Sequence, residues 1–139
     1  MPRSEKEVLA DNVREWVEKA EEDFQAAQQL IKSGSLWNVI GFHCQQAAEK
    51  YLKSLLTAGK IEFSKTHNLI ELVGLLAKMK PGLSRKFKEV HSLTPYAIFT
   101  RYPGDAHPLK LEEAKEALRL ASKTRRITTQ FVKKFNDSK

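Results

Sequence analysis

Two residues that could together act on a phosphodiester stand near the end of this sequence, Arg101 and His107, with five residues between them. A guanidinium binds phosphate oxygens through paired hydrogen bonds, and an imidazole donates or accepts a proton near neutral pH. RNA carries its own nucleophile, the 2′-hydroxyl, so cleavage without a metal needs little more than these two groups. We therefore predict Arg101 and His107 as catalytic residues. The alternative is that the arginine ties a loop to a carboxylate such as Glu49 and that the histidine is merely exposed.

A second polar group lies in the stretch GFHCQQAAEKYLK, which has helical spacing. His43, Gln46 and Lys50 stand at i, i+3 and i+7 and so share one face of a helix. One interpretation makes this face the wall of a basic groove that binds nucleotide or RNA phosphates, with Tyr96 and Tyr102 stacking on bases beside it. The alternative is a solvated face, or a polar layer whose hydrogen bonds are satisfied between helices.

Motifs for other chemistries are not found. The sequence contains no GxxxxGK[ST], GxGxxG, HExxH or GxSxG pattern and no EF-hand loop. Its four histidines share no metal-ligand spacing, so we expect neither a metal nor another cofactor. The single cysteine, Cys44, cannot form an internal disulfide and is interpreted as a small core residue.

The elements that must position these residues are all predicted to be helices, because no alternating strand pattern occurs. Helical spacing predicts five of them, at about 11–32 (or from residue 5), 35–59, 66–79, 83–93 and 109–135. The fold class is therefore all-α, an antiparallel up-and-down bundle of four to five helices, in one domain over residues 1–139.

The expected helix ends follow from individual residues. Ser35 is the expected N-cap of the second helix, and Leu36 is the first residue of its inner face. Thr66 or Asn68 would cap the third helix and Pro81-Gly82 would close it. Pro95 would end or kink the fourth.

Composition and charge limit the classes of function. The 139 residues are 41% hydrophobic and 29% charged, as in an ordinary globular domain, and no apolar run is long enough to span a bilayer, which favours the cytoplasm. The net charge of +7 is uneven, since residues 1–33 hold 5 Lys/Arg against 8 Asp/Glu. Residues 34–100 hold 9 against 4, and residues 101–139 hold 10 against 5. This asymmetry favours an anionic partner such as RNA, but the acidic first helix could also neutralise basic helices within the fold.

Several of these segments together resemble the HEPN domain family, the nucleotide-binding family of higher eukaryotes and prokaryotes. The first is AEEDF with the following alanine pair, and the second is FHCQQAAEKYLK. THNL and the segment from Tyr96 to TRYP follow in the family's order, so the resemblance covers about residues 11–135.

The resemblance implies a helical bundle that forms a homodimer and is often paired with a minimal nucleotidyltransferase in a toxin–antitoxin system. Active relatives are metal-independent RNases with an Arg-x(4–6)-His motif at the dimer interface. Arg101 and His107 fit that motif. An alternative function is a non-catalytic substrate-binding or partner subunit of a nucleotidyltransferase. A third is a helical dimer whose polar residues are structural.

Overall fold

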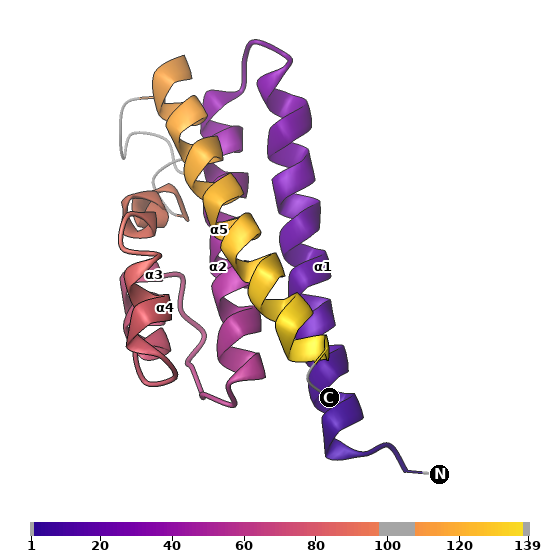
Figure 1. Cartoon of the computed structure of the whole chain (residues 1–139). Helices are drawn as coiled ribbons and strands as arrows, with labels where there is room; N and C mark the ends of the chain where they lie inside the picture. Colours follow the sequence, from indigo (N-terminus) through magenta and orange to yellow (C-terminus); the bar gives the residue numbers. More distant parts are fainter. Residues whose placement is uncertain (1, 98–107, 138–139) are drawn as a thin grey trace.

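Three long helices dominate the computed structural model of the chain, which describes residues 2–97 and 108–137 (Figure 1). They are α1 (Glu5–Ile31), α2 (Trp37–Ala58) and α5 (Leu111–Asp137). α1 and α2 form an antiparallel pair. α5 packs along both and runs in the same direction as α2.

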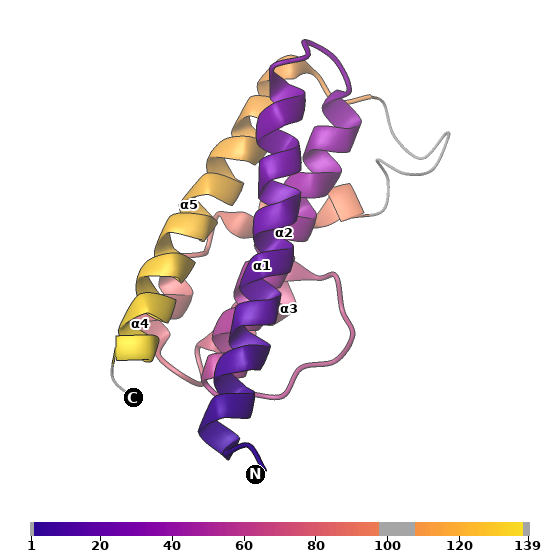
Figure 2. The same ribbon diagram turned by 90° about the vertical axis from the view of Figure 1, so that its right-hand side faces the viewer.

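Three short helices bring the chain back from the end of α2 to the start of α5. They are α3 (Leu69–Leu76), α4 (Pro81–Arg85) and the 3-10 helix η1 (Val90–Ala97), and they form a layer on the side of α2 away from α1 (Figures 1 and 2). The path therefore runs up, down, up and down. Every regular element in the described ranges is helical, which confirms the predicted all-α bundle.

The core is built around α2, whose apolar residues are covered from three sides. Its fully buried residues include Ile40, Cys44, Tyr51, Leu52 and Leu55, at 0% exposure. The rest of the chain packs against them through residues that are also buried: Ala20, Phe24, Ala27, Leu69, Leu72, Leu76, Leu83, Phe87, Val90, Leu93, Ala114 and Ala121. Small residues on α1, α2 and α5 allow these long helices to approach closely.

The N-terminus of α2 differs from the prediction. The N-cap is Leu36 and not Ser35, and its backbone is left-handed, with φ 65° and ψ 36°. No side chain caps this helix end. Leu36 is also 53% exposed and so does not belong to the inner face. Gly34, at φ 74°, and Leu36 are both left-handed, so the chain turns through two such residues between α1 and α2.

The predicted third and fourth helices also need correction. Asn68 does cap α3, accepting a hydrogen bond from the N–H of Ile70 at 2.9 Å, but α3 ends at Leu76 and Pro81 opens α4 at its first turn. A fixed φ and a missing N–H suit Pro81 to that position. The expected helix at 83–93 is divided into α4 and η1, and Pro95 lies inside η1. An α-helix continued through Pro95 would lose a hydrogen bond and clash with the preceding turn, whereas a short 3-10 segment tolerates the proline.

None of the helices in the described ranges combines the length and the apolar character that crossing a bilayer requires.

Candidate functional site

The carboxylate of Asp23 on α1 holds two of the predicted binding residues of α2. His43 Nδ1 lies 2.8 Å from Asp23 Oδ1, and Lys50 Nζ donates to Asp23 Oδ2 at 2.6 Å. The side chains of Lys50 and His43 are about a quarter exposed, and that of Asp23 is 13% exposed. The three residues form a cluster at the edge of the α1–α2 interface, which we call the Asp23 cluster.

The electrostatics of this cluster follow from its geometry. Burial raises the pKa of the Asp23 carboxyl, but hydrogen bonds from His43 and Lys50 act in the opposite direction and prevail. The pKa therefore lies below its ordinary value of 3.8. An ionised carboxylate only accepts hydrogen bonds, so His43 Nδ1 must carry a proton.

The predicted residue Gln46 belongs to a second network on α2. Its side-chain amide donates to Gln45 Oε1 at 2.7 Å, and Gln45 in turn donates to the carbonyl of His67 at 3.1 Å. Glu49, only 3% exposed, accepts from Lys53 at 3.0 Å and lies 2.8 Å from His67 Nδ1. This network ties the connector before α3 to α2. It also engages both oxygens of Glu49, the carboxylate considered above as a partner for Arg101.

A third cluster, which sequence reasoning did not identify, joins all three long helices. Tyr51 Oη donates to Glu21 Oε1 at 2.6 Å, and Arg125 Nε donates to the same oxygen at 2.7 Å. Burial raises the pKa of Glu21, but hydrogen bonds from Arg125 and Tyr51 outweigh it and lower the pKa. Burial, followed by the bond to Glu21, raises the pKa of Tyr51. The acidic first helix thus neutralises basic groups on α2 and α5, as one of the interpretations expected.

Tyr96 is not brought next to His43 and Lys50. It packs against Gly41, where a built Cβ would lie 3.4 Å from its ring. Gly41 and His43 are two residues apart and therefore point to nearly opposite sides of α2. η1, which carries Tyr96, contacts α2, α3 and α5 but not α1. A single groove walled by the His43–Lys50 face and Tyr96 is therefore not formed.

Arg101, Tyr102 and His107 lie outside the described residues. The residues that flank them are placed, however. Leu109 is 5% exposed, and its N–H donates to Asn38 Oδ1 at 2.7 Å. Leu109 packs against Gly41 as Tyr96 does, because a Cβ added at Gly41 would lie 2.5 Å from Leu109 Cδ1. The two ends of the segment that carries the predicted catalytic pair are thus fixed at one point on α2.

Cys44 is buried at 0% exposure beneath this point, and burial raises the pKa of its thiol to about 12. The residue is an inert part of the core, as expected. In the described ranges no three histidine, cysteine or carboxylate side chains are grouped as metal ligands.

The all-helical bundle can be compared with known protein families. The sequence model of the HEPN domain family matches residues 13–131, and the chain belongs to that family. A crystal structure of an archaeal HEPN homologue is similar in fold, with a TM-score of 0.65 and 22% identity, over 86% of this chain and 97% of the other. No curated protein matches the chain.

Proposed function

We propose that this HEPN protein binds the phosphates of RNA or of a nucleotide beside η1 and cleaves RNA there without a metal, in the cytoplasm. Arg101 holds the phosphate oxygens and His107 transfers the proton. Tyr96 and Tyr102 position the bases. His43, Gln46 and Lys50, which lie on the other side of α2 from Tyr96, provide a separate contact for phosphates at the edge of the α1–α2 interface.

The observation that carries this proposal is the shared anchor at Gly41. Tyr96 precedes the segment with Arg101 and His107, Leu109 follows it, and both pack against the same glycine. The chain thus enters and leaves the segment that holds Arg101 and His107 at one place on α2, which supports the proposal that these two residues act on one phosphate.

The reaction uses groups that the substrate and these two residues provide. His107 removes the proton of the RNA 2′-hydroxyl, whose oxygen attacks phosphorus and expels the 5′-oxygen of the next nucleotide. The leaving oxygen takes a proton from water or from the imidazolium. Arg101 stabilises the charge that develops on the phosphate oxygens. The products are a 2′,3′-cyclic phosphate and a 5′-hydroxyl.

The test is incubation of purified protein with end-labelled RNA of mixed sequence in EDTA. Arg101→Ala and His107→Ala should each lower the cleavage rate by about 100-fold or more, the usual effect of removing a general acid–base or a charge-stabilising group. Arg14→Ala and His91→Ala are matched controls on the described surface and should cleave normally. Cleavage that persists in both catalytic variants would show a contaminating nuclease.

RNA binding without cleavage would favour the non-catalytic alternative, a substrate-binding subunit of a nucleotidyltransferase. The Asp23 cluster is the observation that supports this alternative. Lys50 and His43 are held by a carboxylate, which suits a fixed binding surface as well as a catalytic one. Co-purification with a nucleotidyltransferase encoded by the neighbouring gene, in the absence of RNase activity, would support that function.

We also propose that the protein is a homodimer and the toxin of a toxin–antitoxin pair. Leu36 and Val39 support a self-contact, since they are 53% and 40% exposed and adjoin each other at the start of α2. This exposed pair lies near Asn38 and Leu109, so a dimer formed through it would place two predicted sites close together.

A further inference from the structure

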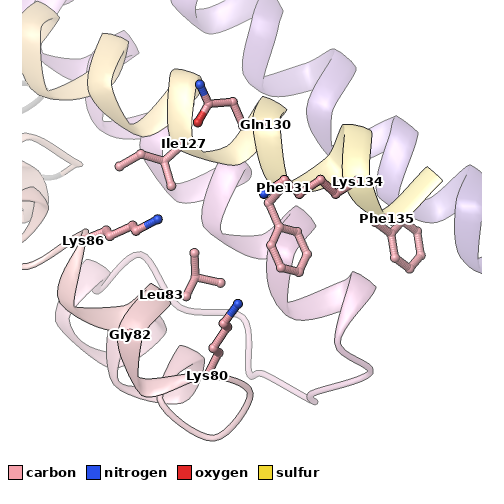
Figure 3. Close-up of a pocket in the computed structure, with 9 residues that line it drawn as sticks. All are labelled: Lys80, Gly82, Leu83, Lys86, Ile127, Gln130, Phe131, Lys134 and Phe135. Atoms are coloured by element: carbon pink, nitrogen blue, oxygen red, sulfur yellow. The ribbon is translucent and has the colours of Figure 1, made fainter. Parts of the chain in front are cut away.

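A groove separates α4 from the C-terminal half of α5, at the end of the bundle away from the Gly41 anchor (Figures 1 and 3). Its volume is about 560 Å³. No Cα atom of α4 comes within 8 Å of one in α5, and residues of both helices line the groove between them. Pockets that hold small organic ligands typically measure about 300–1,000 Å³, so this groove can hold a nucleotide-sized group.

The lining combines apolar surface with positive charge. Leu83 forms the α4 side, and the rings of Phe131 and Phe135 come from α5. Figure 3 shows the ring of Phe131 projecting from α5 toward α4, with Lys80 and Lys86 extending into the same space. Lys134 adds a third ammonium group from α5.

The charge around the groove is unusually one-sided. Residues 72–88 contain five Lys/Arg and residues 117–136 contain six, and neither stretch contains an Asp or Glu. Asp137, two residues after Phe135, is the described carboxylate nearest in sequence to the α5 side of the groove, whereas Glu21 is paired with Arg125 and Glu89 with Arg119 and Lys123.

The lysines that line the groove take no part in these ion pairs. Lys80, Lys86 and Lys134 are exposed, and none forms an ion pair with a carboxylate within residues 2–97 or 108–137. Three uncompensated ammonium groups around two aromatic rings suit a ligand that carries both negative charge and a flat apolar face.

We propose that this groove is a binding site for single-stranded RNA. One base stacks on Phe131, and Lys80, Lys86 and Lys134 contact the phosphates on either side. Ammonium groups act as point charges, and an aromatic ring stacks on any base, so binding is independent of base sequence. The choice of RNA over DNA rests on the proposed function, whereas the groove itself does not involve Arg101 or His107.

An acidic amphipathic helix of another protein could also meet a basic, apolar groove. The observations favour RNA because three separated lysines match repeated phosphates. The apolar surface is also short, being limited to about two turns of α5 opposite a helix of five residues. The experiment below distinguishes the two.

The experiment measures the fluorescence anisotropy of a labelled 12-nucleotide RNA with the full-length protein, from 50 to 200 mM salt. For single-stranded nucleic acid, a plot of log affinity against log salt concentration becomes less steep by about 0.7 for each phosphate contact that is lost. The triple variant Lys80→Gln, Lys86→Gln, Lys134→Gln should lower the slope by about 2 and weaken binding about 50-fold at 150 mM salt.

The matched control is Lys6→Gln, Lys19→Gln, Lys115→Gln, which has the same net charge but changes exposed lysines elsewhere. It should bind nearly as the wild type does. Phe131→Leu keeps an apolar side chain but removes the ring, and should weaken binding about 5- to 100-fold, the value of one stacked base. Thermal melting checks that each variant is folded.

Three results would overturn the proposal. The first is that the wild type does not bind RNA, and the second is that both triple variants lose RNA affinity equally. The third is that a labelled acidic helical peptide binds in a lysine-dependent way and RNA does not. DNA of the same sequence, and a mononucleotide, serve as further arms. Cleavage that is lost in Arg101→Ala but unchanged in the groove variants would leave the proposed function intact and remove only the groove.

Discussion

Asp23 shows how one residue decides what its neighbours can do. Without it, the Lys50 ammonium would be an unpaired cation on the surface of α2 and His43 would lose its carboxylate partner. With it, each is paired within 3 Å. The cluster therefore attracts an anion less strongly than an unpaired Lys50 would, because the charges of the lysine and the carboxylate cancel.

The substitution Asp23→Asn should change stability in a pH-dependent way. The folded pKa of Asp23 lies below its ordinary value of 3.8, so its stabilising effect is complete above that value and is lost as the pH falls through the folded pKa. We expect Asp23→Asn to lower the free energy of unfolding by about 1–3 kcal/mol at pH 7, the usual value of a charge-assisted hydrogen bond. The difference from wild type should shrink below about pH 4.

Urea denaturation at pH 3, 5 and 7 measures this effect. Glu22→Gln, one position away on the exposed side of α1, is the control and should change stability little at any of these pH values. A loss from Asp23→Asn that is as large at pH 3 as at pH 7 would contradict the assignment.

Thr128 is an opposite case, a polar group that costs stability. Its Oγ1 is buried and finds no hydrogen-bond partner in the described ranges. Thr128→Val keeps the shape and removes the unsatisfied hydroxyl, so thermal or urea unfolding should show a gain of about 1 kcal/mol. Thr124→Val is the matched control. Thr124 is equally buried but donates to the carbonyl of Leu120 at 2.8 Å, so the same change should bring no gain.

At the scale of elements, the sequence predicts the long helices well and the short ones poorly. α1, α2 and α5 have apolar residues at helical spacing over 22 to 27 residues, and that pattern leaves one interpretation. The stretch after Met79 is short enough that one α-helix and two separate turns have the same apolar positions. The two prolines favour the division, since Pro81 opens α4 and Pro95 lies inside the 3-10 helix η1.

The site was predictable only in part, for a related reason. That His43 and Lys50 share a face follows from their spacing. That this face meets Asp23, with Tyr96 on the opposite side of α2, depends on how α1 and η1 are rotated about α2. A carboxylate such as Asp23 does not differ from its neighbours Glu21 and Glu22 in sequence alone.

Two glycines in helices provide a test of the Gly41 anchor, where Tyr96 and Leu109 meet α2. At Gly74 a Cβ would meet nothing within 4 Å, so Gly74→Ala should raise stability by about 1 kcal/mol through helix propensity. At Gly41 the added Cβ would lie 2.5 Å from Leu109 Cδ1, which must move. We expect Gly41→Ala to gain less stability than Gly74→Ala and to lower the RNA cleavage rate. Equal cleavage by the two variants would separate the anchor from the activity.

At the scale of the whole molecule, the acidic helix α1 neutralises part of the positive charge of the later helices. Asp23 pairs with Lys50 on α2 and Glu21 pairs with Arg125 on α5, whereas the net charge of the chain is +7. The groove between α4 and α5 lies in the part that is not neutralised. The fold thus leaves a basic surface without requiring a basic core, since its buried charge, at Glu49 and Lys53, is paired.

The exposed Leu36 at the start of α2 leads to a prediction about self-association. Leu36 is a strained choice of residue, because a left-handed backbone costs an ordinary side chain roughly 1 kcal/mol and suits Asn or Gly better. Its exposed side chain therefore makes sense as a contact with a second copy. Leu36→Asn should leave the monomer at least as stable as wild type and weaken the dimer. Light scattering over a concentration series measures the dimer, and thermal melting of dilute protein measures the monomer. Ile70→Asn, which removes another exposed apolar side chain on α3, should leave the dimer intact. A wild type that is only monomeric at micromolar concentration, or a dimer lost equally in both variants, would contradict a contact at the start of α2.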